Sequence, residues 1–353
     1  MRVLSLFDGI GTGRLALERA GIDVDVYYSS EIDKNAIAIS KYNYPNIIQV
    51  GDVTKLDFTQ FKDIDLILSA SPCQNLSVAN RTRQGIYGEN SNLFFKFIEA
   101  LEIIRPKYFL QENVASMKNE DKRIITEEFL KLYPDTQIIQ IDSALVSAQS
   151  RKRIYWTNIP VIQPKDKGIY LEDILEEVPD LWNITDQFLT DGCIKYFDND
   201  SIRALNGKRI NIEKLDKPYC LKEVRTEQGK ALRRAARLQG KGDTTPRNAE
   251  CKMFVPRTDN KANCLTTTCN HDSIVVLTGD KTIVRYLTPR ECDRLQTMGD
   301  DYTRYGDFNG EIREMSNSAR YKALGNGWTC DVIVHILNGI KKPINMTVPK
   351  RLF

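Results

Sequence analysis

The sequence VLSLFDGIGTG, residues 3–13, joins an apolar strand to a glycine-rich turn, and a helical stretch follows at 14–20. Glycines let the backbone turn tightly and pass close to a ligand, and the helix offers the positive end of its dipole. The third glycine of a dinucleotide fingerprint is absent, because Arg14 occupies its position. Asp8 would also repel a pyrophosphate, so the turn favours a cofactor without phosphates that carries a cationic centre and an amino-acid end.

Apolar, strand-like runs recur through the first 160 residues and alternate with helical patterns. The clearest helix is 93–104, where the apolar side chains share one face and Pro106 follows its end. This alternation predicts an α/β fold with a doubly wound, Rossmann-like parallel sheet that binds ligands at the carboxyl ends of its strands. The expected strands are 3–7, 25–29, 47–50, 65–69, 108–111, 137–141 and 153–157.

The alternation stops near residue 160. The chain is then irregular to about residue 280, with short strand candidates at 253–255 and 273–277, and helical patterns return at 288–297 and 329–340. We therefore expect one large domain with a smaller, irregular domain inserted into it. The large domain comprises 1–160 and 320–353, and the insertion 161–319 includes a returning helical segment.

The net charge of +3 conceals a basic segment. Residues 201–265 carry 16 Lys and Arg against 7 Asp and Glu, whereas the rest of the chain carries 34 against 40. The local balances are therefore +9 and −6. Clustered positive charge predicts a phosphate-binding surface, although a solvated, loop-rich surface is compatible with the same composition.

The composition excludes several classes of protein. No apolar run of about 18 residues could span a bilayer, and the sequence lacks an export signal. We therefore expect a cytoplasmic protein whose eight cysteines are mostly free thiols. With only His271 and His335, most histidine-based metal sites and hydrolase triads are excluded. Cys251, Cys264, Cys269 and His271 match no common zinc-finger spacing, so no metal site is expected.

Two acidic residues follow the second and third expected strands. Glu31 lies 20 residues after Gly11, the spacing of a carboxylate that binds ribose hydroxyls. Asp52, within Gly51-Asp52-Val53, is placed to accept a hydrogen bond from an adenine amino group. Each acid alone could be a helix cap or a surface residue. Three acids at successive strand ends, together with the glycines, favour S-adenosylmethionine over NAD.

A cysteine follows the fourth expected strand. Cys73 lies in Ser71-Pro72-Cys73-Gln74, directly after the apolar run 65–70, so we expect it on the same rim as the glycine turn. A thiolate is a strong nucleophile when helix N-termini or arginines lower its pKa. Most cysteines are instead buried and inert, but Pro72 and the polar stretch 74–92 favour an exposed loop.

Further polar groups are expected on this rim. Glu112-Asn113-Val114 ends the next strand. Gln149, Arg151 and Arg153 fall on one face of an extended chain, because its side chains alternate between faces. A thiolate, a carboxyl group and a pair of arginines suit a base that must be attacked, protonated and held.

In this order the motifs resemble those of the DNA cytosine-5 methyltransferase family, from Val3 to about Ile340. The resemblance implies an S-adenosylmethionine-dependent enzyme that methylates C5 of a flipped-out cytosine in double-stranded DNA, in a restriction-modification setting. We expect a phage or bacterial source. Several stretches are nevertheless closer to the eukaryotic de novo methyltransferases, namely FDGIGTG (7–13), SPCQNLSVANRTRQGIY (71–87), LTPRECDRLQTM (287–298) and LGNGWTCDVIVHIL (324–337).

The resemblance implies a role for each matching residue. Cys73 would add to C6 of the cytosine, and Glu112 would hydrogen-bond N3 and the exocyclic amine. Arg151 and Arg153 would bind the base and orient the Cys73 loop. The cofactor would be held by Phe7, by the backbone of Asp8, Gly9, Ile10, Gly11 and Thr12, and by Glu31, Asp52, Val53, Asn326, Gly327 and Trp328.

The chemistry explains why a cysteine is required. Cytosine C5 is too weak a nucleophile to accept a methyl group from a sulfonium, whereas a thiolate at C6 makes C5 enamine-like. The base must leave the duplex before these atoms can be reached. Residues 161–319 would recognise the target, although Cys264 stands where the family usually has threonine.

Two alternative functions stay open. One branch of the family methylates cytosine in tRNA, with a compact recognition region and a Cys-Phe-Thr string that this chain lacks. The other alternative is a catalytically silent DNA-binding scaffold. Such proteins usually lose the Pro-Cys pair, the glutamate or the glycine turn, all of which are present here.

Overall fold

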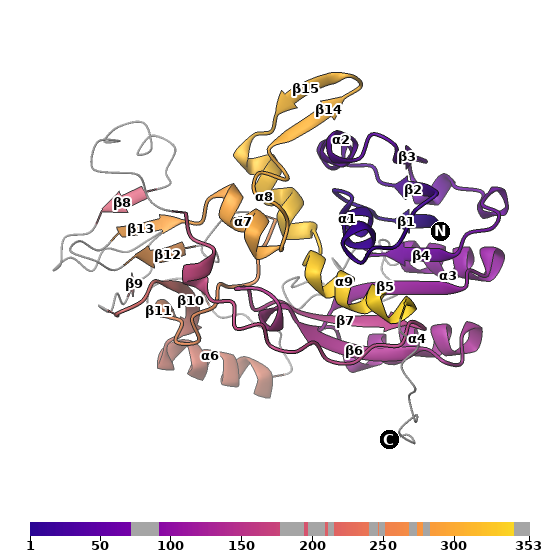
Figure 1. Cartoon of the computed structure of the whole chain (residues 1–353). Helices are drawn as coiled ribbons and strands as arrows, with labels where there is room; N and C mark the ends of the chain where they lie inside the picture. Colours follow the sequence, from indigo (N-terminus) through magenta and orange to yellow (C-terminus); the bar gives the residue numbers. More distant parts are fainter. Residues whose placement is uncertain are drawn as a thin grey trace.

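The computed structural model contains a large and a small sheet, flanked by helices, and a two-stranded hairpin (Figure 1). Cys73 and most of its predicted loop lie outside the described residues. The structure describes residues 1–71, 92–176, 194–196, 209–210, 215–239, 246, 251–267, 274–277 and 283–341.

The large sheet has the strand order β3-β2-β1-β4-β5-β7-β6. Strands β1 to β5 run parallel to one another, with β1 between β2 and β4. These strands confirm the predicted α/β fold, with ends within a few residues of those expected. They are β1 (Arg2–Leu6), β2 (Val26–Ser30), β3 (Ile48–Gln49), β4 (Leu66–Ser69), β5 (Tyr108–Val114), β6 (Gln137–Asp142) and β7 (Lys152–Thr157).

One edge of this sheet differs from the expected parallel arrangement. Strand β7 lies between β5 and β6 and runs antiparallel to both. The chain passes from Asp142 to Lys152 through a segment that is too short for a crossover, which needs a dozen or more residues. An antiparallel pairing is therefore the one that this connection allows.

Helices cover both faces of the large sheet, and side chains alternate between the two faces along each strand. Val3 and Leu66 pack with α1, α2 and α9, whereas Leu4 and Ile67 pack with α3 and α4. Because both faces are buried, the strands read as nearly continuous apolar runs. These helices are α1 (Thr12–Arg19), α2 (Lys34–Asn43), α3 (Asn92–Ile104), α4 (Asn119–Leu132) and α9 (Cys330–Leu337).

The region that the sequence predicted to be irregular contains the small sheet, in the order β8-β13-β12-β10-β11-β9. Its core includes Tyr219, Leu221 and Phe254, all fully buried. Most of these strands are too short to produce a periodic pattern, which is why the sheet was not predicted. The small lobe contains β8 (Ile194–Tyr196), β9 (Arg209–Ile210), β10 (Tyr219–Arg225), α6 (Glu227–Leu238), β11 (Lys252–Pro256), β12 (Ile274–Leu277) and β13 (Ile283–Tyr286).

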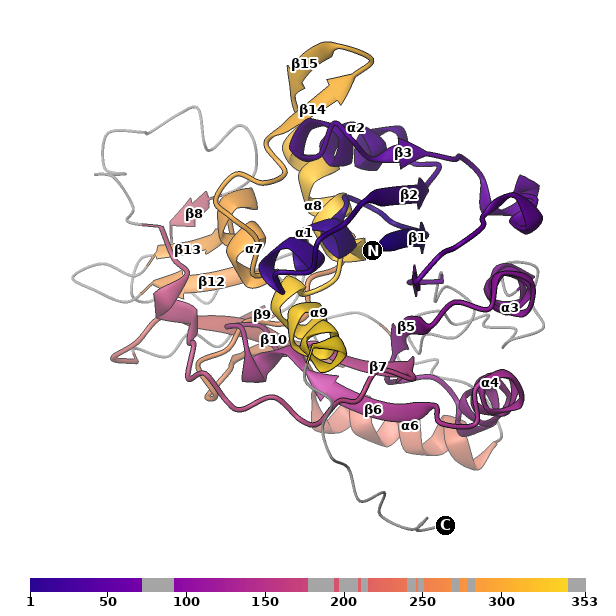
Figure 2. The same ribbon diagram turned by 45° about the vertical axis from the view of Figure 1, so that its right-hand side comes forward.

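The C-terminal part of the chain returns to the large sheet. Strand β14 packs against α2, and α9 packs against α1 (Figure 2). Segments far apart in the sequence therefore lie side by side, next to the carboxyl end of β1. The returning elements are α7 (Pro289–Leu295), β14 (Tyr305–Phe308), β15 (Glu311–Glu314), α8 (Asn317–Asn326) and α9.

Buried polar contacts join the two lobes. Ala262 forms a parallel bridge with Gln149, and the Lys261 ammonium donates to the carbonyl oxygens of Ala144 at 2.8 Å and Ser147 at 3.1 Å. Because Lys261 is only 7% exposed, these carbonyls replace its hydration. The segment 261–267 thus anchors the small lobe beside β7.

None of the helices in the described part of the chain combines the length and the apolarity that crossing a bilayer requires.

Candidate functional site

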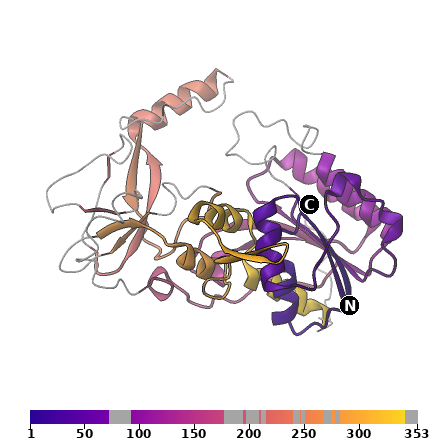
Figure 3. The ribbon, with the colours of Figure 1, turned by 90° about the horizontal axis from the view of Figure 1, so that it is seen from above.

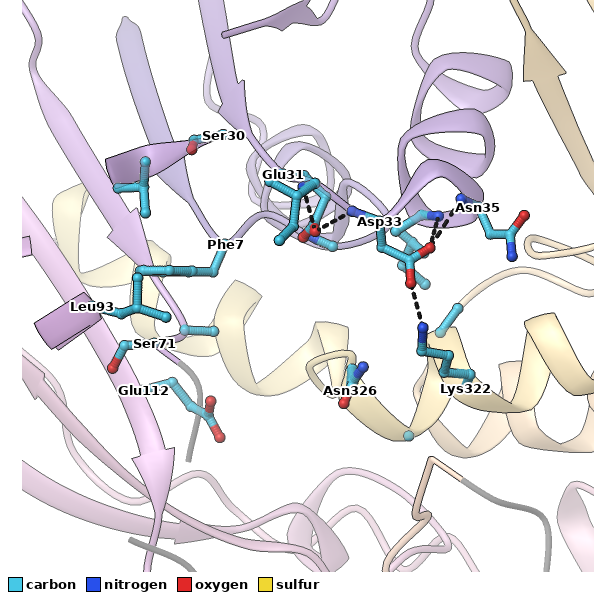
Figure 4. A pocket seen from close by; sticks show the side chains of 18 of the residues that line it. Phe7, Ser30, Glu31, Asp33, Asn35, Ser71, Leu93, Glu112, Lys322 and Asn326 are labelled. Atoms are coloured by element: carbon cyan, nitrogen blue, oxygen red, sulfur yellow. Dashed lines mark hydrogen bonds and ion pairs between the residues drawn. The ribbon is translucent and has the colours of Figure 1, made fainter. Parts of the chain in front are cut away.

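A cavity of about 320 Å³ opens at the carboxyl ends of the central strands (Figure 4). Strands β1, β2, β4 and β5 supply one wall, and α8 supplies another. Seven of the residues expected to bind a cofactor line it, namely Phe7, Gly9, Ile10, Glu31, Asp52, Val53 and Asn326. Glu112, Arg151 and Arg153 line it as well, together with Ser71, Asp33 and Lys322.

The glycine turn leaves β1 with an unusual backbone. Phe7 has a φ of 59°, a left-handed conformation that costs a residue with a Cβ roughly 1–2 kcal/mol. Gly11 caps α1 with a φ of 77°, which glycine adopts without this cost. An added Cβ at Gly11 would lie 3.2 Å from Ser40 Oγ, so this residue faces α2 and not the cavity.

Asp8 turns away from the cavity. Tyr27 donates its hydroxyl hydrogen to Asp8 Oδ1 at 2.6 Å, and the carboxyl group is buried behind the turn. Burial raises the pKa of Asp8 to about 6. Thr12 is also buried. The expected group Asp8–Thr12 therefore divides, because Gly9 and Ile10 line the cavity whereas Asp8, Gly11 and Thr12 support the turn from behind.

Asp8 predicts a pH dependence of stability. Its pKa is about 6 in the folded chain and 3.8 in the unfolded chain. The contribution of Asp8 to the free energy of unfolding therefore falls as pH rises from about 4 to 6 and is constant above pH 6. The full decrease is about 3 kcal/mol. We expect the unfolding free energy of Asp8→Asn, relative to the native chain, to rise by this order across the window. Chemical denaturation at several pH values measures it, and parallel pH profiles for the two proteins would contradict it.

Glu31 braces the glycine turn from the end of β2. Its Oε2 accepts a hydrogen bond from the Gly9 amide at 2.9 Å, and its Oε1 accepts from Ile32 and Asp33 at 2.7 and 2.9 Å. The side chain is fixed at the cavity wall by these bonds (Figure 4). A carboxylate has about four acceptor positions, so Glu31 retains the capacity to bind a ligand hydroxyl.

Asp52 and Asp33 add negative charge to the cavity. Hydrogen bonds from the Thr54 amide and hydroxyl to Asp52 lower the pKa of this carboxyl, so it is ionised at neutral pH. Asp33 caps α2 and pairs with the Lys322 ammonium of α8 at 2.6 Å. This ion pair joins the two walls of the cavity near Asn326 (Figure 4).

Glu112 lies in the cavity between two donors. Its Oε1 is 2.7 Å from Arg153 Nε, and its Oε2 accepts from Trp328 Nε1 at 3.3 Å. Arg153 pairs with Val114 across the β5–β7 ladder, which puts it diagonal to Glu112 on the same face. The expectation that Glu112 and Arg153 share a rim therefore agrees with the geometry. Trp328 and Gly327 lie behind this wall and do not line the cavity.

Arg151 is engaged differently from the expectation that it binds a base. Its guanidinium is buried and donates to the carbonyl oxygens of Leu265 at 3.0 Å, Gly325 at 3.0 Å and Gly327 at 2.9 Å. It also contacts Cys264 Sγ at 3.3 Å. A buried carbonyl that loses its donor costs about 1–3 kcal/mol. Arg151 thus connects the small lobe and the end of α8 to the large sheet.

Ser71, the last described residue before Cys73, is held by β5. Gln111 Nε2 donates to Ser71 Oγ at 2.8 Å, and Asn113 Nδ2 donates to the Ser71 carbonyl at 3.3 Å. All three residues are buried. Gln111 was not predicted from the sequence, although a glutamine within the apolar strand FLQENV indicates a polar partner. The two amides fix the point where the Cys73 segment begins.

The donor set of the cavity suits a cationic cofactor without phosphates. Glu31, Asp33, Asp52 and Glu112 line it. Among the described lining residues, the three cations already have oxygen partners: Lys322 on Asp33, Arg153 on Glu112, and Arg151 on backbone carbonyls. A pyrophosphate would meet more carboxylates than available cations. S-adenosylmethionine, with its sulfonium and ammonium groups, fits this environment.

Known proteins similar to this chain fall into one group. A model of the C-5 cytosine-specific DNA methylase family matches residues 1–342. The orphan methyltransferase M.Rho11sI of Bacillus phage rho11s is 36% identical over 162 residues, which cover 44% of this chain and 32% of that protein. The type II methyltransferase M.NlaX of Neisseria lactamica is 31% identical over 194 residues, covering 51% and 61%. The chain thus spans less than two thirds of either relative.

Solved structures with a similar fold cover almost the whole chain. The S. pombe Dnmt2 methyltransferase has a TM-score of 0.58 at 17% identity and covers 98% of this chain and 100% of its own. The Entamoeba histolytica methyltransferase EhMeth has a TM-score of 0.60 at 15% identity, with coverages of 98% and 99%. At these identities the likeness shows a shared fold.

Proposed function

The chain belongs to the C-5 cytosine-specific DNA methylase family, and on this premise we propose that it transfers a methyl group from S-adenosylmethionine to C5 of cytosine in double-stranded DNA. The family assignment confirms the resemblance predicted from the motifs, and the relatives named above come from a phage and a bacterium, as expected. One observation carries the proposal: a single cavity contains Glu112, the glycine turn, Glu31 and Ser71, two residues before Cys73.

S-adenosylmethionine would lie against the residues that line the cavity near the glycine turn. Glu31 would bind the ribose hydroxyls and Asp52 would bind the adenine amino group. Phe7 and Val53 would pack against the adenine ring. Asn326 would close the methionine side. When bound, the cofactor supplies an electrophilic methyl group on its sulfonium. Asp8, Gly11 and Thr12 would maintain the conformation of the glycine turn. Gly327 and Trp328 would support the opposite wall of the cavity.

Cys73 would act as the nucleophile. Its thiolate adds to C6 of the cytosine, which forms an S–C6 bond and raises the electron density at C5. Glu112 would hydrogen-bond N3 and the exocyclic amine and so support protonation of N3 as the adduct forms. After C5 is methylated, N3 gives up the proton it had gained, C5 loses its own proton to a base, and the S–C6 bond breaks. The ring becomes aromatic again and the thiolate is released.

Arg153 would position Glu112 in this reaction. Its guanidinium is 2.7 Å from Glu112 Oε1, and this ion pair fixes the orientation of the carboxylate. Arg151 would act at a greater distance from the base, because its donors hold the segment 261–267 and the end of α8. The two arginines that the motif places together would therefore differ in role.

The target base must leave the duplex to reach the cavity, at a cost of a few kcal/mol of stacking and pairing. We assign recognition of the DNA to the insertion 161–319 and catalysis to residues 1–160 and 320–353. We further propose a role in restriction-modification, in the cytoplasm of a bacterium or a phage-infected cell and near its nucleoid. The relative M.NlaX, a type II methyltransferase, supports the first part of this proposal.

Transfer of tritium from methyl-labelled S-adenosylmethionine tests the substrate. We expect label in duplex plasmid DNA and none above background in total tRNA, and bisulfite sequencing of the plasmid identifies the methylated site. Label in tRNA alone would replace the proposal with the RNA alternative. The absence of label in both, together with DNA binding, would favour the silent scaffold.

A further inference from the structure

Helix α6 presents a row of positive charges on the small lobe. Lys230, Arg234 and Arg237 follow one another at the i, i+4, i+7 spacing that places side chains on one face of a helix, and all three are exposed. The row is about 10 Å long, because a helix rises about 1.5 Å per residue. These three residues, the α6 row, take no part in the cofactor cavity.

The adjacent side of α6, about 100° around the helix from the row, is anchored to the small lobe. Gly229 and Ala236 are the buried residues of the helix, and Arg233 between them is half-buried. A Cβ at Gly229 would lie 2.1 Å from the Cys251 carbonyl oxygen, so the helix backbone is in direct contact with the start of β11. The Thr226 hydroxyl caps the helix by accepting from the Gly229 amide. Because this side is anchored, the α6 row faces outward.

The charge of α6 is almost entirely positive. It carries four basic residues and one acidic residue, Glu227, which pairs with Lys230 at 2.5 Å. Glu227 is 85% exposed, and an exposed ion pair contributes little to stability. A phosphate can therefore replace Glu227 as the partner of Lys230 with little loss of free energy. Seen from above, α6 extends away from the small sheet at the same edge of the molecule as α3 and α4 (Figure 3).

We propose that the α6 row binds the sugar-phosphate backbone of duplex DNA. This inference rests on the proposed function, which supplies the duplex. Each strand carries one phosphate per 3.4 Å of helix axis, so a row of about 10 Å spans roughly three phosphates. Contacts of this kind set the register and affinity of a DNA-binding protein and carry no sequence information. The α6 row would thus hold the duplex while other parts of the small lobe read it.

An anionic membrane is the other polyanion that a basic helix can bind. Membrane binding needs a continuous apolar face beside the charges. The exposed leucines of α6, Leu232 and Leu238, are six residues apart and therefore about 120° apart around the helix. Exposed Ala231 and Ala235 lie between them, so α6 has an apolar side that carries only these two large side chains. Duplex DNA is the favoured polyanion because the family to which the chain belongs acts on DNA, and vesicle binding is measured as the alternative.

A triple substitution tests the α6 row. In the full chain, Lys230→Gln, Arg234→Gln and Arg237→Gln remove three exposed charges and leave the anchoring residues intact. The matched control is Arg123→Gln, Lys131→Gln and Arg313→Gln, three exposed cations of the large lobe. Fluorescence anisotropy with a labelled duplex gives Kd between 50 and 200 mM NaCl, the range over which counterion release is measured. Methyl transfer at saturating duplex is measured in parallel, as is binding to phosphatidylserine vesicles.

We expect the α6 variant to bind the duplex at least about tenfold more weakly at low salt, with a salt slope reduced by about 0.9 for each lost phosphate contact. The control should retain the native slope, and both variants should methylate a saturating duplex at the native rate. Equal salt slopes for the two variants would overturn the inference. It would also be overturned if the native chain bound no duplex, or if the α6 variant lost binding to vesicles and kept its binding to the duplex. A native chain that binds DNA through the α6 row but methylates none would instead overturn the proposed function.

Discussion

Replacing Cys73 with alanine is expected to abolish methyl transfer and to leave cofactor binding nearly unchanged. In the proposed mechanism, C5 becomes nucleophilic only when sulfur is bonded to C6. Alanine cannot form this bond. Removal of a catalytic nucleophile lowers turnover by several orders of magnitude in well-characterised enzymes, so we expect a loss of at least about 10⁴-fold. The residues assigned to S-adenosylmethionine follow β1, β2 and β3 or lie at the end of α8, and this change leaves them untouched.

Two measurements separate chemistry from binding in this variant. Duplex DNA that contains 5-fluorocytosine should trap a covalent complex with the native chain, because fluorine at C5 prevents the final elimination, whereas Cys73→Ala should form none. Equilibrium binding of labelled S-adenosylmethionine should agree within about twofold between the two proteins. Cys264→Ala is a suitable control, because this cysteine lies beside Arg151 at the same site and should still allow the complex to form. Normal methylation by Cys73→Ala would refute the mechanism.

The large sheet could be predicted from the sequence because its strands are short, apolar and separated by helices. Burial on both faces produces this pattern directly, and the expected ends of β1, β4 and β5 differ from the observed ends by a few residues. The orientation of β7 could not be read from the pattern, since an apolar run has no direction. The small sheet escaped prediction because it pairs β9 with β11 and β8 with β13 across long stretches of chain.

The position of site residues was easier to predict than the direction of their side chains. A residue at the carboxyl end of a central strand must lie on the rim, and Glu31 and Glu112 do so. Asp8 lies on the same rim but turns inward, because Tyr27 offers a hydroxyl donor behind the turn. Arg151 is directed toward three carbonyls that come from distant parts of the chain. These partners exist only after folding, so a linear motif contains no trace of them.

The buried position of Lys261 could not be predicted from the sequence for the same reason. Lys261 belongs to a basic segment, and its charge alone predicts a surface position. In the fold its ammonium is buried among carbonyl oxygens of the large lobe. Burial lowers the pKa of this lysine, as expected for a cation removed from water. Part of the positive charge of 201–265 therefore joins the lobes, and the exposed remainder, including the α6 row, is available to a polyanion.

Glu112→Gln is expected to slow methyl transfer by about 10²–10⁴-fold, the usual contribution of a positioned acid–base group, with little change in DNA affinity. Glutamine has nearly the same shape, and its carbonyl oxygen can still accept from Trp328 Nε1. It lacks the negative charge that balances a proton on N3 of the cytosine. It also leaves the Arg153 guanidinium, 2.7 Å away in the native chain, without its carboxylate partner. The barrier for adduct formation should therefore rise while the contacts to the DNA backbone persist.

Single-turnover kinetics at saturating duplex measure the chemical step in this variant, and anisotropy measures Kd for the same duplex. We expect the rate constant to fall by the stated factor and Kd to change by less than about threefold. Glu127→Gln provides the matched control, because this exposed glutamate also pairs with an arginine, Arg123, but lies on α4. Its rate should equal that of the native chain. If the rate of Glu112→Gln fell only in proportion to a weaker Kd, Glu112 would act in binding, and proton transfer to N3 would need another group.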